Sequence, residues 1–191
     1  MMLLLVRHGE TLSNRQGLLL GRADPPLTDV GEAQARHVAS TLPVPDRVIS
    51  SPLRRALDTA AAFGSPVEID ERWIELDYGE LDERASNSVA DDLWARWRAD
   101  SSFAPPGGES LSALSSRIAA ACAELAEEAA GSTVVVVTHV SPIKAALAWA
   151  LDAPIGISWR MYVEDASVSR IDFGSDGAVV RWFNRGMSGA D

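Results

Sequence analysis

Two of the three histidines in this sequence directly follow apolar runs that are typical of buried strands. Arg7 and His8 follow the Leu-Leu-Leu-Val run at residues 3–6, and His139 follows residues 133–138, which include four consecutive valines. Such continuous runs are found in strands that are buried on both faces of a parallel sheet. Ligands of α/β sheets bind at the carboxyl ends of these strands. We therefore expect both imidazoles to lie in one crevice if the two strands are neighbours.

Arginines are expected at the same crevice. Arg7 precedes His8, and Arg55 lies near the start of a helix that is expected after Ser51-Pro52. Guanidinium groups bind phosphate oxygens through paired hydrogen bonds, as do the backbone amides at helix N-termini. Their positive charge also lowers the pKa of a neighbouring imidazole, which keeps a ring nitrogen neutral and nucleophilic. A pocket of this composition predicts chemistry on a phosphoryl group.

Two other interpretations of the histidines have to be weighed. His8 and His139 could bind zinc together with a carboxylate, but neither has a second ligand at the close spacing of a metal motif, and Arg7 and Arg55 would repel a divalent cation. His8 could also be a structural core histidine, which the nearby Asn14 and the second histidine disfavour. We expect a site with no metal and no other cofactor.

Composition restricts the class of protein and of partner. The chain has 191 residues, of which 47% are hydrophobic, and a formal net charge of −10, so we expect one globular domain over residues 1–191. The acidic charge argues against nucleic acid and anionic membranes as partners.

The single cysteine, Cys122, leaves no disulfide framework. The apolar start is too short for a signal peptide or a membrane span, so we expect a cytoplasmic monomer or homodimer.

The elements that position these residues alternate between strands and helices. Apolar periodicity and flanking Gly, Pro, Ser and Thr residues predict strands at 3–6, 47–50, 67–69, 133–138, 168–173 and 178–183, and helices at 28–42, 53–63, 110–130 and 141–151. This order predicts an α/β fold, a three-layer α/β/α sandwich with a mostly parallel central sheet and a C-terminal antiparallel hairpin. The two pairs Ser51-Pro52 and Ser141-Pro142 predict serine caps for the helices that follow them.

Two segments lack this alternation. Residues 11–26 are rich in Gly and Pro and predict a loop over the crevice. Residues 70–106 predict an acidic, lid-like insertion with one helix at 88–98, which a capping box of Ser88 and Asp91 would start. Trp94 and Trp97 would form the apolar face of this helix. That spacing favours packing in a core or a lid over a platform for substrate.

Four strings in this order resemble the histidine phosphatase superfamily, the phosphoglycerate-mutase-like enzymes. They are Arg7-His8-Gly9-Glu10-Thr11 with Asn14, then Ser51-Pro52-Leu53 with Arg55-Ala56 and Thr59-Ala60, then Glu75 four residues before Gly79, and finally Thr138-His139. The resemblance spans nearly the whole chain. It implies an α/β/α sandwich and a covalent phosphohistidine at His8. It also implies a phosphate pocket formed by Arg7, Arg55 and His139, with Asn14 as a further contact.

The resemblance adds three residues whose role composition does not predict. It implies that Glu75 is the general acid, and the apolar residues beside it would favour the protonated form if they bury it. By composition alone, Glu75 is one of several carboxylates in an acidic loop. Gly21 and Arg22 match a stretch that flanks the substrate in members of the family, and they are weaker candidates.

Three functions are compatible with these residues. The first is a phosphatase that hydrolyses small phosphorylated metabolites, and the stretch from Glu75 to Asp82 resembles the phosphatases of the family. The second is a phosphoglycerate mutase, which would have to retain a bisphosphate. Residues 80–102 are acidic and contain three arginines as their cations, so a lid built from them would repel a bisphosphate. The third, a non-catalytic binding relative, is disfavoured because every expected chemical group is present.

Overall fold

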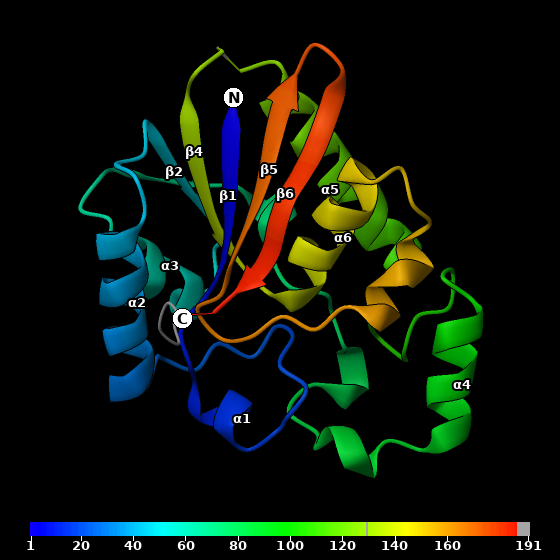
Figure 1. Ribbon diagram of the computed structural model, residues 1–191. Helices are drawn as coiled ribbons and strands as arrows, with labels where there is room; N and C mark the ends of the chain where they lie inside the picture. The colour runs from blue at the N-terminus through cyan, green and yellow to red at the C-terminus, as the bar shows by residue number, and fades with distance from the viewer. Residues whose placement is uncertain (129, 187–191) are drawn as a thin grey trace.

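A mixed sheet lies at the centre of the computed structural model, which describes residues 1–128 and 130–186. Within these residues the sheet has six strands in the order β3-β2-β4-β1-β5-β6. The strands are β1 (Met2–Arg7), β2 (Arg47–Ser50), β3 (Val67–Ile69), β4 (Thr133–Thr138), β5 (Val168–Gly174) and β6 (Gly177–Arg185). The first four run parallel, and β5 and β6 form an antiparallel hairpin at one edge (Figure 1).

Helices cover both faces of this sheet, so the predicted three-layer sandwich is confirmed (Figure 1). The α-helices are α1 (Leu12–Arg15), α2 (Asp29–Thr41), α3 (Arg54–Ala61), α4 (Asp91–Ala99), α5 (Leu111–Ala126) and α6 (Val140–Ala150). Short 3₁₀ helices are η1 (Glu71–Trp73), η2 (Gly79–Leu81), η3 (Ser86–Ser88) and η4 (Ile155–Arg160). Helices α2 and α3 lie on one face, and α5 and α6 lie on the other.

The first strand shows why its sequence is apolar throughout. Leu3 and Leu5 pack in the cluster beneath α5 and α6, whereas Leu4 and Val6 pack in the cluster beneath α2 and α3. Successive side chains of a strand point to opposite faces of the sheet, and here both faces are covered. All four side chains are therefore buried. A strand of this kind holds the residue that follows it, His8, in a rigid frame.

The two predicted serine caps are wrong. Helix α3 begins at Arg54, and its N-cap residue, Leu53, makes no side-chain capping bond. Helix α6 begins at Val140, and its N-cap is His139, again with no side-chain bond. The Ser51 hydroxyl contacts Nε2 of His139 instead, and the Ser141 amide donates to the Glu75 carboxylate. The physical reason is that Ser51 directly follows β2, where a buried histidine competes for its hydroxyl, and that Ser141 already lies inside the first turn of α6.

Segments expected to be irregular contain more structure than the sequence predicts. The loop at 11–26 includes α1, which is closed by a capping box between Thr11 and Asn14. In the insertion, α4 begins at Asp91 with Ala90 as its N-cap, so the predicted capping box at Ser88 is wrong. The Ser88 hydroxyl donates to the carbonyl of Ala85 within a 3₁₀ turn.

Other helix ends agree closely with the sequence. Thr28 caps α2 by accepting from the Gly31 amide, and Ser110 caps α5 by accepting from Ala113. Helix α5 ends at Ala126, before the predicted end at 130, and position 129 lies outside the described residues. None of the described helices combines the length and apolar character that a bilayer span requires.

Candidate active site

The two strand-end histidines meet at one edge of the sheet. Strands β1 and β4 are parallel neighbours with Arg7 opposite Thr138, so the residues that follow them emerge side by side. The ring centroids of His8 and His139 lie 5.1 Å apart with an interplanar angle of 59°. Both rings are buried. The two imidazoles therefore lie together as expected, because the register of two strands far apart in sequence places them side by side.

The hydrogen bonds of His8 define which ring nitrogen is free. Its Nδ1 lies 2.7 Å from the Gly9 carbonyl oxygen, which can only accept, so Nδ1 carries the hydrogen. On the other side, Nε of Arg55 donates to Nε2 of His8 at 3.3 Å, and a guanidinium can only donate. Both contacts assign the same tautomer. Nε2 therefore carries no hydrogen, and its lone pair faces the Arg55 guanidinium.

Burial and positive charge keep both imidazoles neutral. Burial, followed by the charges of Arg55 and Arg7, holds the pKa of His8 well below 6.5, and the bond to Gly9 opposes this only in part. Burial and Arg55 likewise hold the pKa of His139 well below 6.5. Desolvation disfavours the charged ring, and nearby cations disfavour it further. The neutral imidazole expected from the sequence is thus supported by its surroundings.

Arg55 is held from three directions. Its guanidinium donates to the carbonyls of Ala23 at 2.7 Å and Gly21 at 2.9 Å, in addition to His8. The side chain is fully buried, and burial lowers its pKa to about 10, with Glu75 opposing the shift. It therefore remains a cation at neutral pH. A buried, fully oriented guanidinium binds a phosphate without having to reorganise.

The loop that holds Arg55 is itself held by Asp82, a residue that the sequence analysis missed. Its carboxylate accepts from three consecutive amides, those of Gly21 at 2.7 Å, Arg22 at 2.8 Å and Ala23 at 2.8 Å. A side chain on Gly21 would lie 2.8 Å from the Leu76 carbonyl oxygen, which explains the glycine. No local pattern could reveal this contact, because about 60 residues separate its partners.

The side chain of Arg22 points to acidic residues. Its Nε lies 3.6 Å from the carboxylate of Asp77, and its Nη2 lies 3.7 Å from that of Glu109. Arg22 thus links the loop at 21–24 to Asp77 in the insertion and to Glu109, which directly precedes the N-cap of α5. Among the described residues, its buried Nε has no hydrogen-bond partner.

Arg7 is anchored by a loop near the end of the chain. Its guanidinium donates to the Val163 carbonyl at 2.7 Å and pairs with Asp165 at 2.6 Å. Burial raises the pKa of Asp165, and Arg7 opposes this. Within the described part of the chain, the buried Nε of Arg7 has no partner. Asp165 is a second residue that sequence reasoning missed, since 158 positions separate it from its partner.

Glu75 is buried at the edge of the crevice, which the sequence could not establish. Only 3% of it is exposed. Its carboxylate accepts from the amides of Leu76 at 2.6 Å and Ser141 at 3.2 Å, and its backbone carbonyl accepts from Arg117 at 3.2 Å. The Ser141 amide belongs to the first turn of α6. Glu75 and His139 are therefore positioned by the same helix start.

Two hydroxyls connect the site to the surrounding helices. Ser51 Oγ lies 2.7 Å from Nε2 of His139. Thr59 Oγ1 accepts from the Gly9 amide at 3.0 Å and donates to the Arg55 carbonyl at 2.8 Å, which ties the end of β1 to α3. Gly9 is required here, because a side chain on it would lie 2.4 Å from the Gly31 carbonyl oxygen.

Asn14 has a structural contact that limits how it can meet a ligand. Its Oδ1 accepts from the amide and the hydroxyl of Thr11, at 3.0 and 2.7 Å. The side-chain NH₂ is therefore the group that could donate to a phosphate. The described residues contain no cluster of three His, Cys, Asp or Glu side chains suited to a metal ion.

Two of the solved structures that share this fold are phosphatases. A phosphoserine phosphatase from Entamoeba histolytica, solved with 3-phosphoglyceric acid, has a TM-score of 0.90 and 26% identity over 97% of this chain and 98% of its own. A mycobacterial glucosyl-3-phosphoglycerate phosphatase has a TM-score of 0.85 and 28% identity over 96% and 98% of the two chains.

Curated relatives and the family match agree with these structures. A bifunctional protein of Mycobacterium tuberculosis is 38% identical over 92% of this chain, which spans about half (51%) of that protein's length. A probable phosphoglycerate mutase of an Enterobacter strain, GpmB, is 36% identical over 88% of this chain and 83% of its own. The sequence matches the histidine phosphatase superfamily (branch 1) over residues 3–186. This chain, with its strand-end histidines and buried arginines, belongs to the histidine phosphatase superfamily.

Proposed function

We propose that this chain hydrolyses small-molecule phosphomonoesters through a phosphohistidine on His8. The observation that carries the proposal is the unprotonated Nε2 of His8: Nδ1 carries the hydrogen that it donates to Gly9, and Nε2 accepts from Arg55. A neutral imidazole whose lone pair faces a cationic pocket is suited to attack on phosphorus. The solved phosphatases of the same fold support this chemistry.

In the first step, the phosphoryl group lies between the guanidinium groups of Arg7 and Arg55, with His139 and the Asn14 amide as further contacts. Nε2 of His8 attacks phosphorus in line with the ester oxygen, so an N–P bond forms as the P–O bond breaks. Arg55 exchanges its bond to Nε2 for one to a phosphoryl oxygen. These cations stabilise the charge on the equatorial oxygens.

The leaving alkoxide takes its proton from Glu75. The amides of Leu76 and Ser141 hold its carboxyl group in place. In this proposal Glu75 gives its proton to the leaving oxygen and is left as a carboxylate. In the second step, Glu75 takes a proton from water as the water attacks phosphorus and the N–P bond breaks. Inorganic phosphate and neutral His8 are restored.

Gly21 and Arg22 take positioning roles in this proposal. The Gly21 carbonyl orients Arg55, and Arg22 joins the loop to the acidic insertion. The insertion at 70–106 acts as a lid of a single domain over residues 1–191, of which positions 129 and 187–191 lie outside the described residues. Burial of Trp97 in the same core cluster as α5 supports one domain. No step of the mechanism uses a metal.

Phosphoglycerate mutase activity is the second candidate, and the relative GpmB favours it. The same pocket could serve it, provided that the phosphoenzyme excludes water and retains a bisphosphate. The acidic lid argues against this, because it repels the bisphosphate and leaves the phosphohistidine open to water. A purely binding role is disfavoured, because it would not require a free nucleophilic nitrogen.

One experiment distinguishes these candidates. Purified protein is given a panel of phosphomonoesters, and released phosphate is measured. In parallel it is given 3-phosphoglycerate with a trace of 2,3-bisphosphoglycerate, and 2-phosphoglycerate is measured. We expect phosphate release to be much faster than formation of 2-phosphoglycerate. If 2-phosphoglycerate formed much faster than phosphate was released, the mutase would replace the phosphatase as the proposed function. No turnover in either assay would contradict both proposed activities.

A further inference from the structure

A small cavity adjoins the Glu75 end of the site, and the mechanism above assigns no role to it. Its volume is about 70 Å³, and its lining includes Leu76 and Ser141. These are the two residues whose amides hold the Glu75 carboxylate. The cavity therefore begins beside the proposed proton donor. The leaving group of a bound phosphomonoester must lie next to that donor, so the cavity lies on the leaving-group side of the phosphate.

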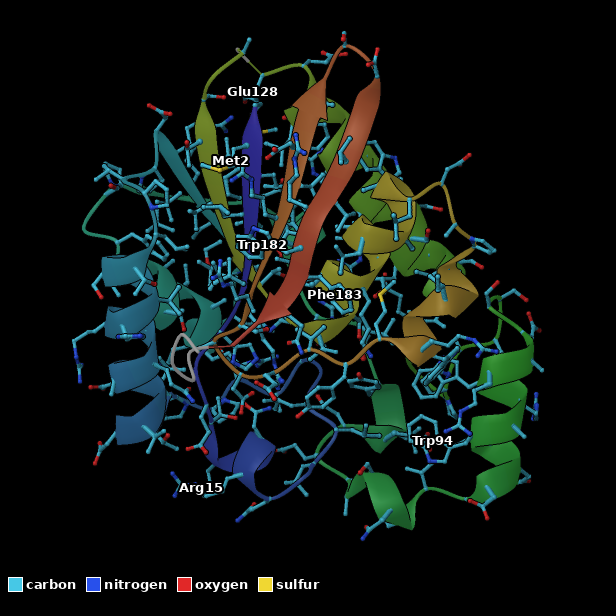
Figure 2. All side chains as sticks on the ribbon, viewed as in Figure 1. Met2, Arg15, Trp94, Glu128, Trp182 and Phe183 are labelled. Atoms are coloured by element: carbon cyan, nitrogen blue, oxygen red, sulfur yellow. The ribbon has the colours of Figure 1, made fainter. Side chains whose placement is uncertain are left out.

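Four of the eleven residues that line the cavity are aromatic, and they pack against one another. Trp94 and Trp97 of α4 stack with centroids 5.5 Å apart, and Trp159 of η4 packs edge-on at 5.9 Å from each. Tyr78 meets Trp97 edge-on at 5.8 Å. Trp94 is labelled in Figure 2, on the side of α4 that faces the rest of the molecule. These rings join the insertion to the body of the fold and exclude water from one side of the cavity.

One charged residue lines this cavity among the described residues, Lys144. It is the only lysine in the sequence, and it lies on α6 one turn after Ser141. It is half-buried, and no described side chain forms an ion pair with it. Burial lowers the pKa of Lys144, and the charge of Glu75 opposes this. An ammonium that is partly desolvated and unpaired gains most from an anionic ligand.

We propose that this cavity is the subsite for the leaving group and that Lys144 binds a carboxylate there. This inference rests on the proposed function and narrows its substrate to phosphorylated hydroxy acids with a short carbon chain. A single water needs about 10–15 Å³ of such space, so the cavity accepts a group of a few heavy atoms rather than a nucleoside. The aromatic wall contacts the carbon atoms, and Lys144 pairs with the acid.

Matched substrates test the assignment. Values of kcat/KM are compared for 3-phosphoglycerate and glycerol 3-phosphate, which differ by a carboxylate in place of a hydroxymethyl group. O-phosphoserine and O-phosphoethanolamine form a second pair. The variants are Lys144→Met, which keeps an apolar stem, and Lys144→Gln as a second replacement. The control is Arg160→Met, which removes an exposed cation beside Trp159 that does not line the cavity.

We expect the wild-type enzyme to prefer the acid in each pair. Both Lys144 variants should reduce that preference roughly 10- to 100-fold, the typical effect of losing a hydrogen bond to a charged group. Arg160→Met should retain it. Thermal unfolding of each variant verifies that it is folded.

Three results would overturn the inference in distinguishable ways. A wild-type enzyme that hydrolyses p-nitrophenyl phosphate but does not discriminate within the pairs refutes the subsite and leaves the proposed function intact. Equal losses on both members of each pair in the Lys144 variants would mean that Lys144 acts through Glu75, and not on a carboxylate. Failure of the wild-type enzyme to hydrolyse any phosphomonoester would instead refute the proposed function itself.

Discussion

Arg55 donates from Nε to Nε2 of His8 at 3.3 Å, so one guanidinium occupies the position from which the proposed nucleophile would attack. This contact does two things. Together with burial, it lowers the pKa of His8, and it faces the lone pair of Nε2 where, in the proposed mechanism, a phosphoryl oxygen would bind. A phosphoryl oxygen can replace Nε2 as the acceptor of the Arg55 hydrogen bond. The phosphorus atom then lies within reach of Nε2, the proposed nucleophile.

Replacement of His8 should abolish turnover without unfolding the protein. We expect His8→Ala to lose nearly all activity, whereas the same change at the exposed His37 should have little effect. Rapid acid-free quenching of wild-type enzyme with labelled substrate should place an acid-labile, base-stable phosphoryl group on the peptide that contains His8. Label on a serine, or full activity in His8→Ala, would show that the nucleophile is another residue.

Replacement of Glu75 should matter most for poor leaving groups. Glu75→Gln keeps the shape of the side chain but cannot donate the proton that an alkoxide needs. We expect kcat for alkyl phosphates to fall by about 10² to 10⁴, the usual contribution of general acid catalysis. Hydrolysis of p-nitrophenyl phosphate should fall much less, since its phenolate leaves without protonation. Equal losses for both substrates would assign Glu75 a binding role.

Asp82 should affect catalysis through Arg55, although it touches no substrate in this proposal. Asp82→Ala removes the acceptor of three loop amides, so the carbonyls that orient Arg55 are released. We expect kcat/KM to fall by about 10- to 100-fold, as small misplacements of catalytic groups do. The neighbouring exposed acid supplies the control, Glu83→Ala. A loss of the same size in the control would point to charge rather than positioning.

Stability should decrease in acid because two histidines are buried in the neutral form. The pKa values of His8 and His139 are lowered in the folded state, so the unfolded chain binds more protons below about pH 6.5. The free energy of unfolding should then fall with decreasing pH, by at most about 1.4 kcal/mol per pH unit for each histidine. Urea unfolding between pH 7.5 and 5 measures this. In His8→Ala, the free energy of unfolding should depend less steeply on pH. The same pH dependence as in the wild type would contradict a neutral, buried His8.

Removal of metal ions should leave activity unchanged. Arg55 and Arg7 lie close enough to both histidines to lower their pKa values, and such cations oppose the binding of a divalent ion. Activity is measured before and after dialysis against a strong chelator. A loss that zinc or magnesium restores would reopen the metal interpretation of His8 and His139.

Local sequence determined the frame of this site. Short continuous apolar runs rich in β-branched or aliphatic residues are typical of strands buried on both sides, so the ends of β1 and β4 were predictable, and with them the positions of His8 and His139. Arg55 was predictable from its place near the start of a helix. Motif order identified the family, and the glycine and proline pattern separated the insertion from the sandwich.

Only the tertiary structure decided how these groups are held. The anchors of Arg7 and Arg55, which are Asp165 and Asp82, lie far from their partners in sequence, and a carboxylate in an acidic loop has no local pattern that distinguishes it. The burial of Glu75 depends on α6, more than 60 residues away. Ser51 and Ser141 were predicted as helix caps because local rules favour that role. In the structure these serines instead contact buried polar groups of the site, His139 and Glu75. Each buried polar group needs a hydrogen-bond partner, and local sequence rules do not include such partners.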